Sequence, residues 1–165
     1  MGKEYGRLAA ISAILCGISA PVHAGTATTT FPVSATVLSV CSVSALPLAF
    51  GNYDPTASVD LDATTSLDVL CTIGTSFTVG LNQGTSSGAT VSTRAMVNGA
   101  DTLDYSLYQD SGRTTNWGNT PGTDTPSATV AGLSATSMTV YGRVPQGQNV
   151  PPGSYLDTIT VTVNY

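Results

Sequence analysis

Residues 153–165 read GSYLDTITVTVNY, and their pattern sets the class of fold. Ile159, Val161 and Val163 alternate with threonines, which is the period of two expected of a β-strand with one face in a core and the other in water. No turn signal and no further strand-like run follow before Tyr165. Because an edge strand presents unpaired backbone groups, we expect this strand to need a partner that later sequence does not supply.

Four earlier runs alternate in the same way. Their apolar positions are Leu67, Val69, Cys71 and Ile73, then Phe77, Val79 and Leu81, then Leu103, Tyr105 and Leu107, then Met138, Val140, Gly142 and Val144. Turn-forming residues separate these runs, and Asn98-Gly99 is a hairpin signal because both residues tolerate a positive φ. The sequence therefore predicts one all-β domain, an antiparallel sandwich of immunoglobulin-like type, with a small closed barrel as the alternative.

The first 24 residues have the features of a secretory signal peptide. Lys3 and Arg7 form a basic start, residues 8–20 are uncharged and largely apolar, and residues 22–24 place small side chains where a signal peptidase reads. We expect cleavage between Ala24 and Gly25. The alternative is a transmembrane anchor, but the apolar run is short for a bilayer and no positively charged stop follows it.

Without this leader the chain contains no lysine, glutamate or histidine, and it keeps three arginines against nine aspartates. It has no basic patch with which to neutralise phosphates, so neither nucleic acid nor anionic lipid is an expected partner. The lack of histidine excludes Ser-His-Asp, Cys-His and histidine–metal sites within the chain itself. We expect a protein that is not an enzyme and that carries no metal or cofactor.

Two groups of side chains leave a binding role open. Asp60, Asp62 and Asp68 lie close in sequence, and paired carboxylates can serve in glycoside hydrolysis or bind calcium. A solvated strand face is the favoured interpretation, because Asp60 and Asp62 would share one face of a strand. Trp117, with tyrosines nearby in sequence, could form a sugar-stacking platform, although a loop tryptophan that caps the core is the simpler explanation.

The cysteines predict one disulfide. Cys16 would leave with the leader, and Cys41 and Cys71 remain as an even pair in an exported chain, which makes a bond between them the default. Such a bond closes a loop of about 30 residues, worth roughly 3–4 kcal/mol in the chain-entropy model. A metal or reactive-thiol site is the competing interpretation, and the lack of histidine argues against it.

Apolar side chains also alternate near the predicted mature N-terminus, at Phe31, Val33, Ala35 and Val37. The run from residue 28 to Cys41 is long for one strand, and it begins almost at a free terminus, where a chain normally frays. The residues alone leave two interpretations open. The run is a plain first strand with a ragged lead-in, or its first part is an arm that pairs with something else and only the part near Cys41 belongs to the domain.

Several segments, taken in order, resemble one known family. They are TVLSVCSVSALPLAFGNYDP (residues 36–55), LDVLCTIG (67–74), Arg94-Ala95-Met96, TLDYSLYQD (102–110), NWG (116–118) and the stretch from residue 140 to the end. Together they are similar to the spore coat protein U domain, whose members are largely subunits of archaic chaperone–usher pili. The resemblance covers nearly the whole chain after the leader, and its order and spacing are more specific than any single piece.

The resemblance implies an incomplete immunoglobulin-like fold that lacks its last strand. A periplasmic chaperone lends a strand during transport, and at the outer-membrane usher the N-terminal arm of another subunit replaces it. The expected layout is a signal peptide in residues 1–24, a donor arm in residues 25–36 and the domain in residues 37–165. The donor side chains would be Phe31, Val33, Ala35 and Val37, and the acceptor-groove strand would contribute Ile159, Val161 and Val163.

The implied function is that of a structural subunit, exported through the periplasm, that polymerises with copies of itself into a surface fibre for adhesion and biofilm formation. The alternative is a secreted binding or coat module that does not polymerise. Pro32 bears on the arm, because proline cannot donate a ladder hydrogen bond. Either its nitrogen faces away from a partner strand, or the arm begins after it.

Overall fold

The computed structural model describes residues 22–165, so the predicted signal peptide lies almost wholly outside the described residues. The chain divides into two units, Met1–Ala35 and Thr36–Tyr165. The described part of the first unit, residues 22–35, contains no helix or strand. Nowhere in residues 22–165 is there a helix long and apolar enough to cross a membrane. The following description concerns the second unit.

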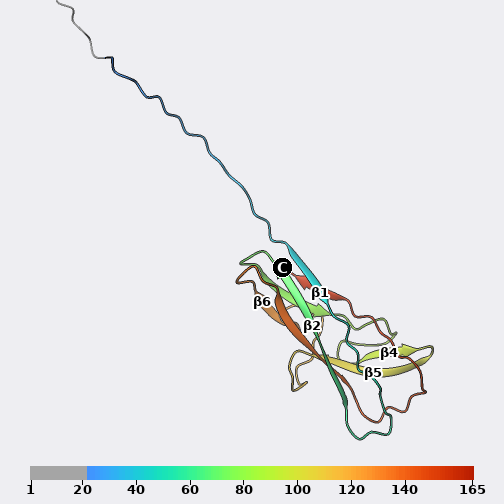
Figure 1. Cartoon of the computed structure of the whole chain (residues 1–165). Helices are drawn as coiled ribbons and strands as arrows, with labels where there is room; N and C mark the ends of the chain where they lie inside the picture. Colours follow the sequence, from blue (N-terminus) through green and yellow to red (C-terminus); the bar gives the residue numbers. More distant parts are fainter. Residues whose placement is uncertain (1–21) are drawn as a thin grey trace, which may run out of the picture. The chain divides into compact units, whose positions relative to one another are not determined.

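The described residues form an all-β fold (Figure 1). Its strands are β1 (Cys41–Ala45), β2 (Leu61–Cys71), β3 (Ser76–Leu81), β4 (Arg94–Asn98), β5 (Asp101–Tyr108), β6 (Ser127–Thr129), β7 (Thr136–Val144) and β8 (Val161–Asn164). They make a five-stranded sheet in the order β1-β2-β7-β5-β4 and a three-stranded sheet in the order β6-β3-β8, with antiparallel pairing throughout. Two separate open sheets exclude the small closed barrel.

The predicted alternation sets the core. The inward positions of β2, β3, β5 and β7 are buried, namely Leu67, Val69, Cys71, Phe77, Val79, Leu81, Leu103, Tyr105, Leu107, Val140 and Val144. Gly142 continues the inward row of β7, and a Cβ atom there would lie 2.7 Å from Leu48 Cδ2 and 2.8 Å from Phe50 Cζ. The glycine therefore lets the segment after β1 pack directly across β7.

The hairpin signal at Asn98-Gly99 is confirmed with a shift of one residue. Asn98 is the last residue of β4 and pairs with Asp101, so the two-residue loop is Gly99-Ala100. Gly99 has a φ of 63°. A positive φ at the first loop position suits glycine and matches the right-handed twist of the flanking strands.

Ile73 departs from the predicted pattern. It continues the parity of β2 in the sequence, but β2 ends at Cys71 and Ile73 is 54% exposed. The chain turns at once, because Gly74 has a φ of 82° and its N–H binds the carbonyl oxygen of Val130 at 2.9 Å. The alternation in the sequence therefore continues past the end of the strand.

The predicted disulfide is confirmed. Cys41 and Cys71 face each other across β1 and β2 and are bonded, with their Cα atoms 4.1 Å apart. The N–H of Thr72 binds the carbonyl of Val40 at 3.0 Å, which makes Cys41 and Cys71 a non-hydrogen-bonded pair, the position where side chains of opposite strands come closest. The bond fixes the start of the domain to the end of β2.

Candidate strand-acceptor groove

The two sheets are open along the same side of the sandwich. β1 is the edge of the larger sheet and β8 is the edge of the smaller one, and within residues 22–165 each pairs on one side only. An unpaired edge exposes a row of N–H and C=O groups that can template another strand. The site is therefore a backbone edge rather than a cluster of reactive side chains.

The register of β8 fixes which of its backbone groups point to the open side. Val161 pairs with Leu81 and Val163 with Val79. Both partners use their backbone groups elsewhere: the N–H of Leu81 binds the carbonyl of Gly118 at 2.8 Å, and the N–H of Val79 binds the carbonyl of Pro126 at 3.1 Å. These are therefore non-hydrogen-bonded pairs, so the N–H and C=O groups of Val161 and Val163 point outward to the open edge.

The same residues point their side chains to the core. Ile159, Val161 and Val163, predicted as the acceptor strand, are half-buried and pack against the core, with Ile159 just before β8 begins. On the other edge, Val43 of β1 shares its face with the fully buried Val69 but is 39% exposed. Core-facing side chains that remain exposed at both edges indicate that a covering element is missing between them.

An apolar groove lies between these edges, with a cavity volume of about 340 Å³. One wall is the segment that follows β1, at residues 45–48 and Phe50, and the other is the segment leading into β8, at residues 155–159 and Val161. Its floor is the core, formed by Leu67, Leu81, Met96, Tyr105, Leu107 and Val140. The groove thus opens the hydrophobic core itself to solvent.

A second hollow adjoins the groove at the end away from β8. Its cavity volume is about 750 Å³, and it is lined by residues 48–53, Pro55, residues 150–153, Tyr155 and Leu156, over Met96 and Leu103. We call it the basal hollow. The groove and the basal hollow are adjacent, because both are lined by Leu48, Phe50, Met96, Tyr155 and Leu156.

A partly buried polar network holds the wall that leads into β8. The Asp157 carboxylate accepts hydrogen bonds from the Tyr105 hydroxyl at 2.7 Å, from the Thr85 N–H and hydroxyl at 2.8 Å each, and from the Thr158 N–H at 2.7 Å. Gly84 makes room for this carboxylate, because its φ is 89° and a Cβ atom there would overlap Asp157. Asp157 therefore anchors the wall to β5 and to the loop after β3.

Arg94 lies on β4 opposite Tyr105 in the register, and its charge interacts with Tyr105 and Asp157 without a hydrogen bond to either. The side chain is fully buried, and its guanidinium donates to four backbone carbonyls at 2.6–3.0 Å, those of Leu81, Asn82, Val91 and Trp117. Burial lowers the pKa of Arg94 to about 10, so it stays charged at neutral pH. Sequence reasoning missed the roles of Arg94 and Asp157, and the only signal was a charged residue beside an apolar strand pattern.

The pKa values of Tyr105 and Asp157 are shifted in opposite directions. Burial, together with the hydrogen bond to Asp157, raises the pKa of the Tyr105 hydroxyl, which therefore remains a donor. Burial also opposes ionisation of Asp157, but the hydrogen bonds from Thr85, Tyr105 and Thr158 outweigh it and hold the pKa of this carboxyl below its usual value of 3.8. The wall of the groove thus contains a stabilised carboxylate at neutral pH.

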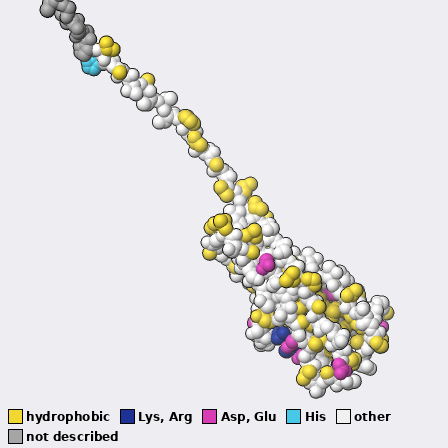
Figure 2. Space-filling view, viewed as in Figure 1, with side chains coloured by type: hydrophobic (Ala, Val, Ile, Leu, Met, Phe, Trp, Pro, Cys, Tyr) yellow, Lys and Arg dark blue, Asp and Glu magenta, His cyan; other side chains and the backbone are white. Residues whose placement is uncertain are grey.

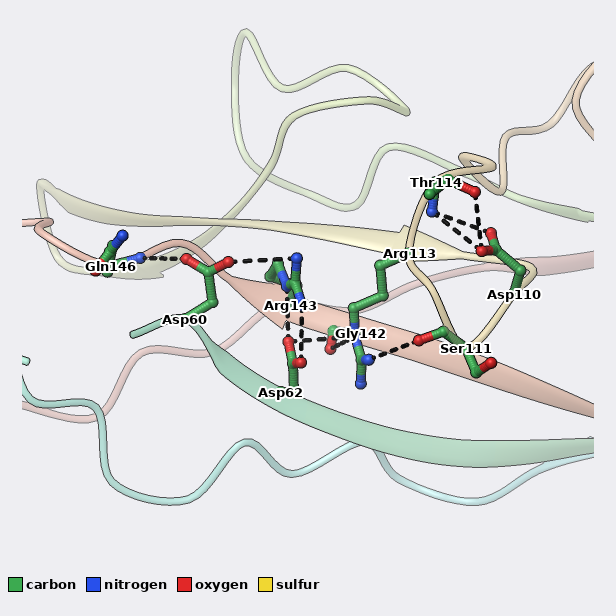
Figure 3. Close-up of polar contacts among 9 residues, drawn as sticks. All are labelled: Asp60, Asp62, Asp110, Ser111, Arg113, Thr114, Gly142, Arg143 and Gln146. Carbon is green, nitrogen blue, oxygen red and sulfur yellow. Dashed lines mark hydrogen bonds and ion pairs between the residues drawn. The ribbon is translucent and has the colours of Figure 1, made fainter. Parts of the chain in front are cut away.

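Asp60 and Asp62, two of the three aspartates that the sequence left open, lie beside arginines on the outer face of the large sheet (Figure 3). Asp62 receives a bidentate pair of bonds from Arg143, its partner across β2 and β7, at 2.8 and 2.9 Å, and Arg113 lies 3.2 Å from the same carboxylate. Asp60 pairs with Arg143 at 3.3 Å. These carboxylates are thus paired with arginines, as expected of a charged strand face, and the described residues contain no cluster arranged to hold a metal.

Trp117 is part of the core. It is 1% exposed, and its indole N–H donates to the carbonyl of Val79 at 2.8 Å. A stacking platform for sugars needs an exposed ring face, so that interpretation is wrong for this residue.

The predicted arm residues lie outside the strands. Phe31 and Val33, in the first unit, are 80% and 84% exposed, and Val37, in the second, is 83% exposed. Because β1 begins at Cys41, residues 28–40 add no strand to either sheet. The pairing of these side chains with an acceptor groove stays a prediction.

Two open sheets around an exposed apolar core define an incomplete immunoglobulin-like β-sandwich. The model of the Spore Coat Protein U domain family matches residues 27–162, and the chain belongs to this family. It is 41% identical over 160 residues to "Protein U" of Myxococcus xanthus, with 88% of each chain covered.

The fold is also similar to a chain in the crystal structure of the CsuC–CsuE chaperone–tip adhesion subunit pre-assembly complex from archaic chaperone-usher Csu pili of Acinetobacter baumannii. The TM-score is 0.59 at 26% identity, covering 79% of this chain and 41% of that chain. This chain therefore spans less than half the length of the solved chain it matches. Family and fold are those of pilus structural subunits, a class distinct from enzymes.

Proposed function

We propose that this protein is a structural subunit of an archaic chaperone–usher pilus that polymerises by donor-strand exchange. One observation carries the proposal: the core-facing residues Val161 and Val163 direct unpaired backbone groups to the open edge of β8, and Val161 also lines the apolar groove beside that edge. A strand placed there would extend the β8 ladder and cover the exposed core at once. The mode of recognition is β-strand addition, in which backbone bonds and alternate side chains both contribute.

The N-terminal arm has the composition that this groove requires. Phe31, Val33, Ala35 and Val37 would point into the groove, and Ser34 and Thr36 would point to solvent. Burying the four apolar side chains contributes roughly 5–10 kcal/mol before any backbone pairing is counted. The acceptor would therefore gain a stabilisation comparable to that of a whole small domain.

Pro32 favours an arm that runs antiparallel to β8. In an antiparallel ladder, directly opposite residues exchange hydrogen bonds and point their side chains to the same face. The outward backbone groups of β8 belong to core-facing residues, so an antiparallel arm would bond through its own core-facing residues, such as Val33 and Ala35. Pro32 faces the other way, and its missing N–H removes no bond to β8.

A parallel arm would lose a bond at Pro32. In a parallel ladder each residue bonds to the two residues that flank its neighbour, so the outward-facing residues of the arm would supply the groups for Val161 and Val163. Pro32 is one of these residues and has no N–H to donate. The proline thus selects the antiparallel direction instead of excluding the arm.

The proposal assigns the remaining partners and the route. A leader in residues 1–24 would direct export, a periplasmic chaperone would fill the groove until assembly, and an outer-membrane usher would exchange that strand for the arm of the next copy. The product would be a surface fibre of repeated subunits that serves attachment and biofilm formation. The likeness to a chaperone-bound Csu subunit supports this assignment.

The test is to replace two inward arm residues, Phe31→Asp with Val33→Asp. Two unpaired carboxylates in a dry groove cost several kcal/mol, enough to offset much of the insertion energy. Fibres, counted by electron microscopy of the cell surface, should disappear, and the amount of chaperone-bound subunit in the periplasm should stay unchanged, because the chaperone fills the groove and leaves the arm free.

The matched control is Ser34→Asp with Thr36→Asp, which adds the same charge to the outward face of the arm. This variant should still assemble fibres. Normal fibres from the Phe31/Val33 variant would refute the arm, and loss of its chaperone complex would show that residues 31–33 serve the subunit's own fold.

A secreted coat module that does not polymerise is the second candidate, and the description of the family as a spore coat domain favours it. Such a module has no need for an exchangeable arm. Deletion of residues 25–36 discriminates between the two: a coat module remains deposited on the cell or spore surface, whereas a fibre subunit is exported but absent from the surface.

A further inference from the structure

Exposed apolar side chains gather at the end of the domain where β1 begins and β2 ends (Figure 2). They are Leu38, Val40, Ile73 and Leu133, with exposed fractions of 73%, 63%, 54% and 86%. Hydrogen bonds tie the segments together, since Val40 bonds Thr72 through both its N–H and its carbonyl, and Gly74 bonds Val130. We call these four residues the apolar pole.

The apolar pole and the basal hollow lie at opposite ends of β8. Asn164, the last residue of β8, pairs with Thr78 near the start of β3, three residues after Thr75, whose carbonyl accepts a hydrogen bond from the N–H of Val130 at the pole. Val161, the first residue of β8, follows the segment that lines the groove and then, at residues 150–156, the basal hollow. One end of the domain therefore projects apolar side chains, and the other end is hollowed and apolar.

We propose that the basal hollow of one copy receives the apolar pole of the copy that donates its arm. The inference rests on the proposed donor-strand exchange and adds to it a second contact between neighbouring subunits. It assigns an occupant to a hollow that the arm alone leaves open.

The chain between the arm and its own domain is so short that an inserted arm brings the donor and acceptor domains into contact. Val37 is the last inward side chain of the arm, and Val40 is already bonded to Thr72 of its own domain. Three residues span at most about 11 Å when fully extended, close to the roughly 10 Å that separates two packed sheets. An inserted arm therefore brings the donor's pole into contact with the acceptor's surface.

The direction of the arm selects the end of the acceptor that is touched. An arm antiparallel to β8 begins near Asn164 and ends near Ile159, on the side of the groove where the basal hollow adjoins it. The acceptor's own arm starts from the opposite end, beside Thr72. The contact is thus head-to-tail, and repetition of a heterologous contact of this kind builds an open chain.

Cysteine crosslinking of assembled fibres tests the contact. Ile73→Cys and Asn52→Cys place one thiol on the pole and one on the rim of the basal hollow, while the native Cys41 and Cys71 are joined to each other. A flexible bis-maleimide should convert fibres of the double variant into a ladder of multimers that survives boiling in detergent and reductant. Ile73→Cys paired with Thr114→Cys, an exposed residue of the loop after β5, is the control and should give no ladder.

The outcomes separate this inference from the proposed function. If wild-type fibres form but the Ile73–Asn52 pair gives no ladder, or the control pair gives an equal ladder, the contact between the apolar pole and the basal hollow is overturned. The proposed insertion of the arm is not affected by that result. Absence of wild-type fibres overturns both.

A second variant, Ile73→Asp with Leu133→Asp, keeps the test decisive if the cysteine pair disturbs assembly. Both side chains are exposed in the single domain, so the amount of chaperone-bound subunit should match wild type while surface fibres become shorter or are lost. Fibres equal to wild type in number and length contradict the contact.

Discussion

Arg94 is a charged side chain with no exposed surface, and none of its hydrogen bonds goes to a carboxylate. Its guanidinium instead makes four hydrogen bonds, to carbonyls at the end of β3, in the loop that follows and of Trp117. Leu81 is a non-hydrogen-bonded position of the β3–β8 ladder, and the other three carbonyls lie outside the strands, so none of the four is bonded within a ladder. The guanidinium therefore takes the place of backbone pairing behind the groove, which a shorter or apolar side chain cannot do.

Replacing Arg94 with methionine should lower the free energy of unfolding by about 3 kcal/mol or more, because four buried carbonyls lose their donor. The measurement is denaturant unfolding of the domain with a fused donor strand, described below. Arg143→Met is the matched control, since it removes an arginine from a partly exposed ion pair and should cost only about 0–1 kcal/mol. Equal effects of the two variants would contradict the role given to Arg94.

Asp157 predicts a specific dependence on pH. Its pKa is held below 3.8 in the folded state, so its contribution to stability is complete above the unfolded value and is lost as the pH falls through the lower folded value. The unfolding free energy of the wild type should therefore fall more steeply below about pH 4 than that of Asp157→Asn. Curves that remain parallel from pH 6 to the acid limb would rule out this contribution.

At the scale of elements, β1 depends on one neighbour and one covalent bond. It pairs with β2 alone, and Cys41 is joined to Cys71 at the point where residues 36–40 enter the domain. In an assembled fibre any pull on the arm would reach the domain at this point. In such a fibre the disulfide would transfer load from an edge strand to β2, which is paired on both sides.

Removing the bond with Cys41→Ala and Cys71→Ala should lower the unfolding free energy by roughly 3–4 kcal/mol, the value for a closed loop of about 30 residues. Thermal unfolding of the variant and of the wild type, with and without reductant, checks this. Reductant should lower the melting temperature of the wild type and leave that of the variant unchanged. A wild type insensitive to complete reduction contradicts the prediction.

At the scale of the whole molecule, the described residues leave part of the core open to solvent along the groove. The unfused domain should therefore self-associate or unfold at low temperature, and a copy of residues 28–38 placed after Tyr165 should give a monomer with a higher melting temperature. Because an antiparallel strand can follow β8 as a hairpin, a linker of about four residues should suffice. Size-exclusion chromatography and thermal unfolding are the measurements.

The length of the linker distinguishes the two directions. A parallel strand would have to begin at the other end of the groove, about 35 Å away for eleven residues, and a four-residue linker cannot span it. Stabilisation only by fusions with long linkers would therefore overturn the antiparallel arm. An unfused domain that is already a stable monomer, with a melting temperature unaffected by fusion, would overturn the incomplete fold.

The sequence by itself determined the faces of the strands and the disulfide partners, and it places no histidine after residue 23. Period-two alternation assigns each side chain to core or solvent, as Val161 and Val79 show, because that assignment is a local property of extended backbone. The alternation predicted the wrong environment for Ile73, because the apolar pattern continues past the turn that ends β2. Alternation does not record where a strand stops.

Only the tertiary structure decided which edges remain open and what holds them. The alternation of apolar residues predicts which face of a strand is buried, but it does not predict which strand lies beside it. The order β1-β2-β7-β5-β4 and the place of β8 in a second sheet therefore depend on contacts between residues far apart in the chain. For the same reason the hydrogen bond between Tyr105 and Asp157 and the position of Arg94 beside them could not be foreseen, since β4, β5 and the segment before β8 meet only after folding. The outward direction of the Val161 and Val163 backbone, which gives Pro32 its place in the arm, follows from that same long-range register.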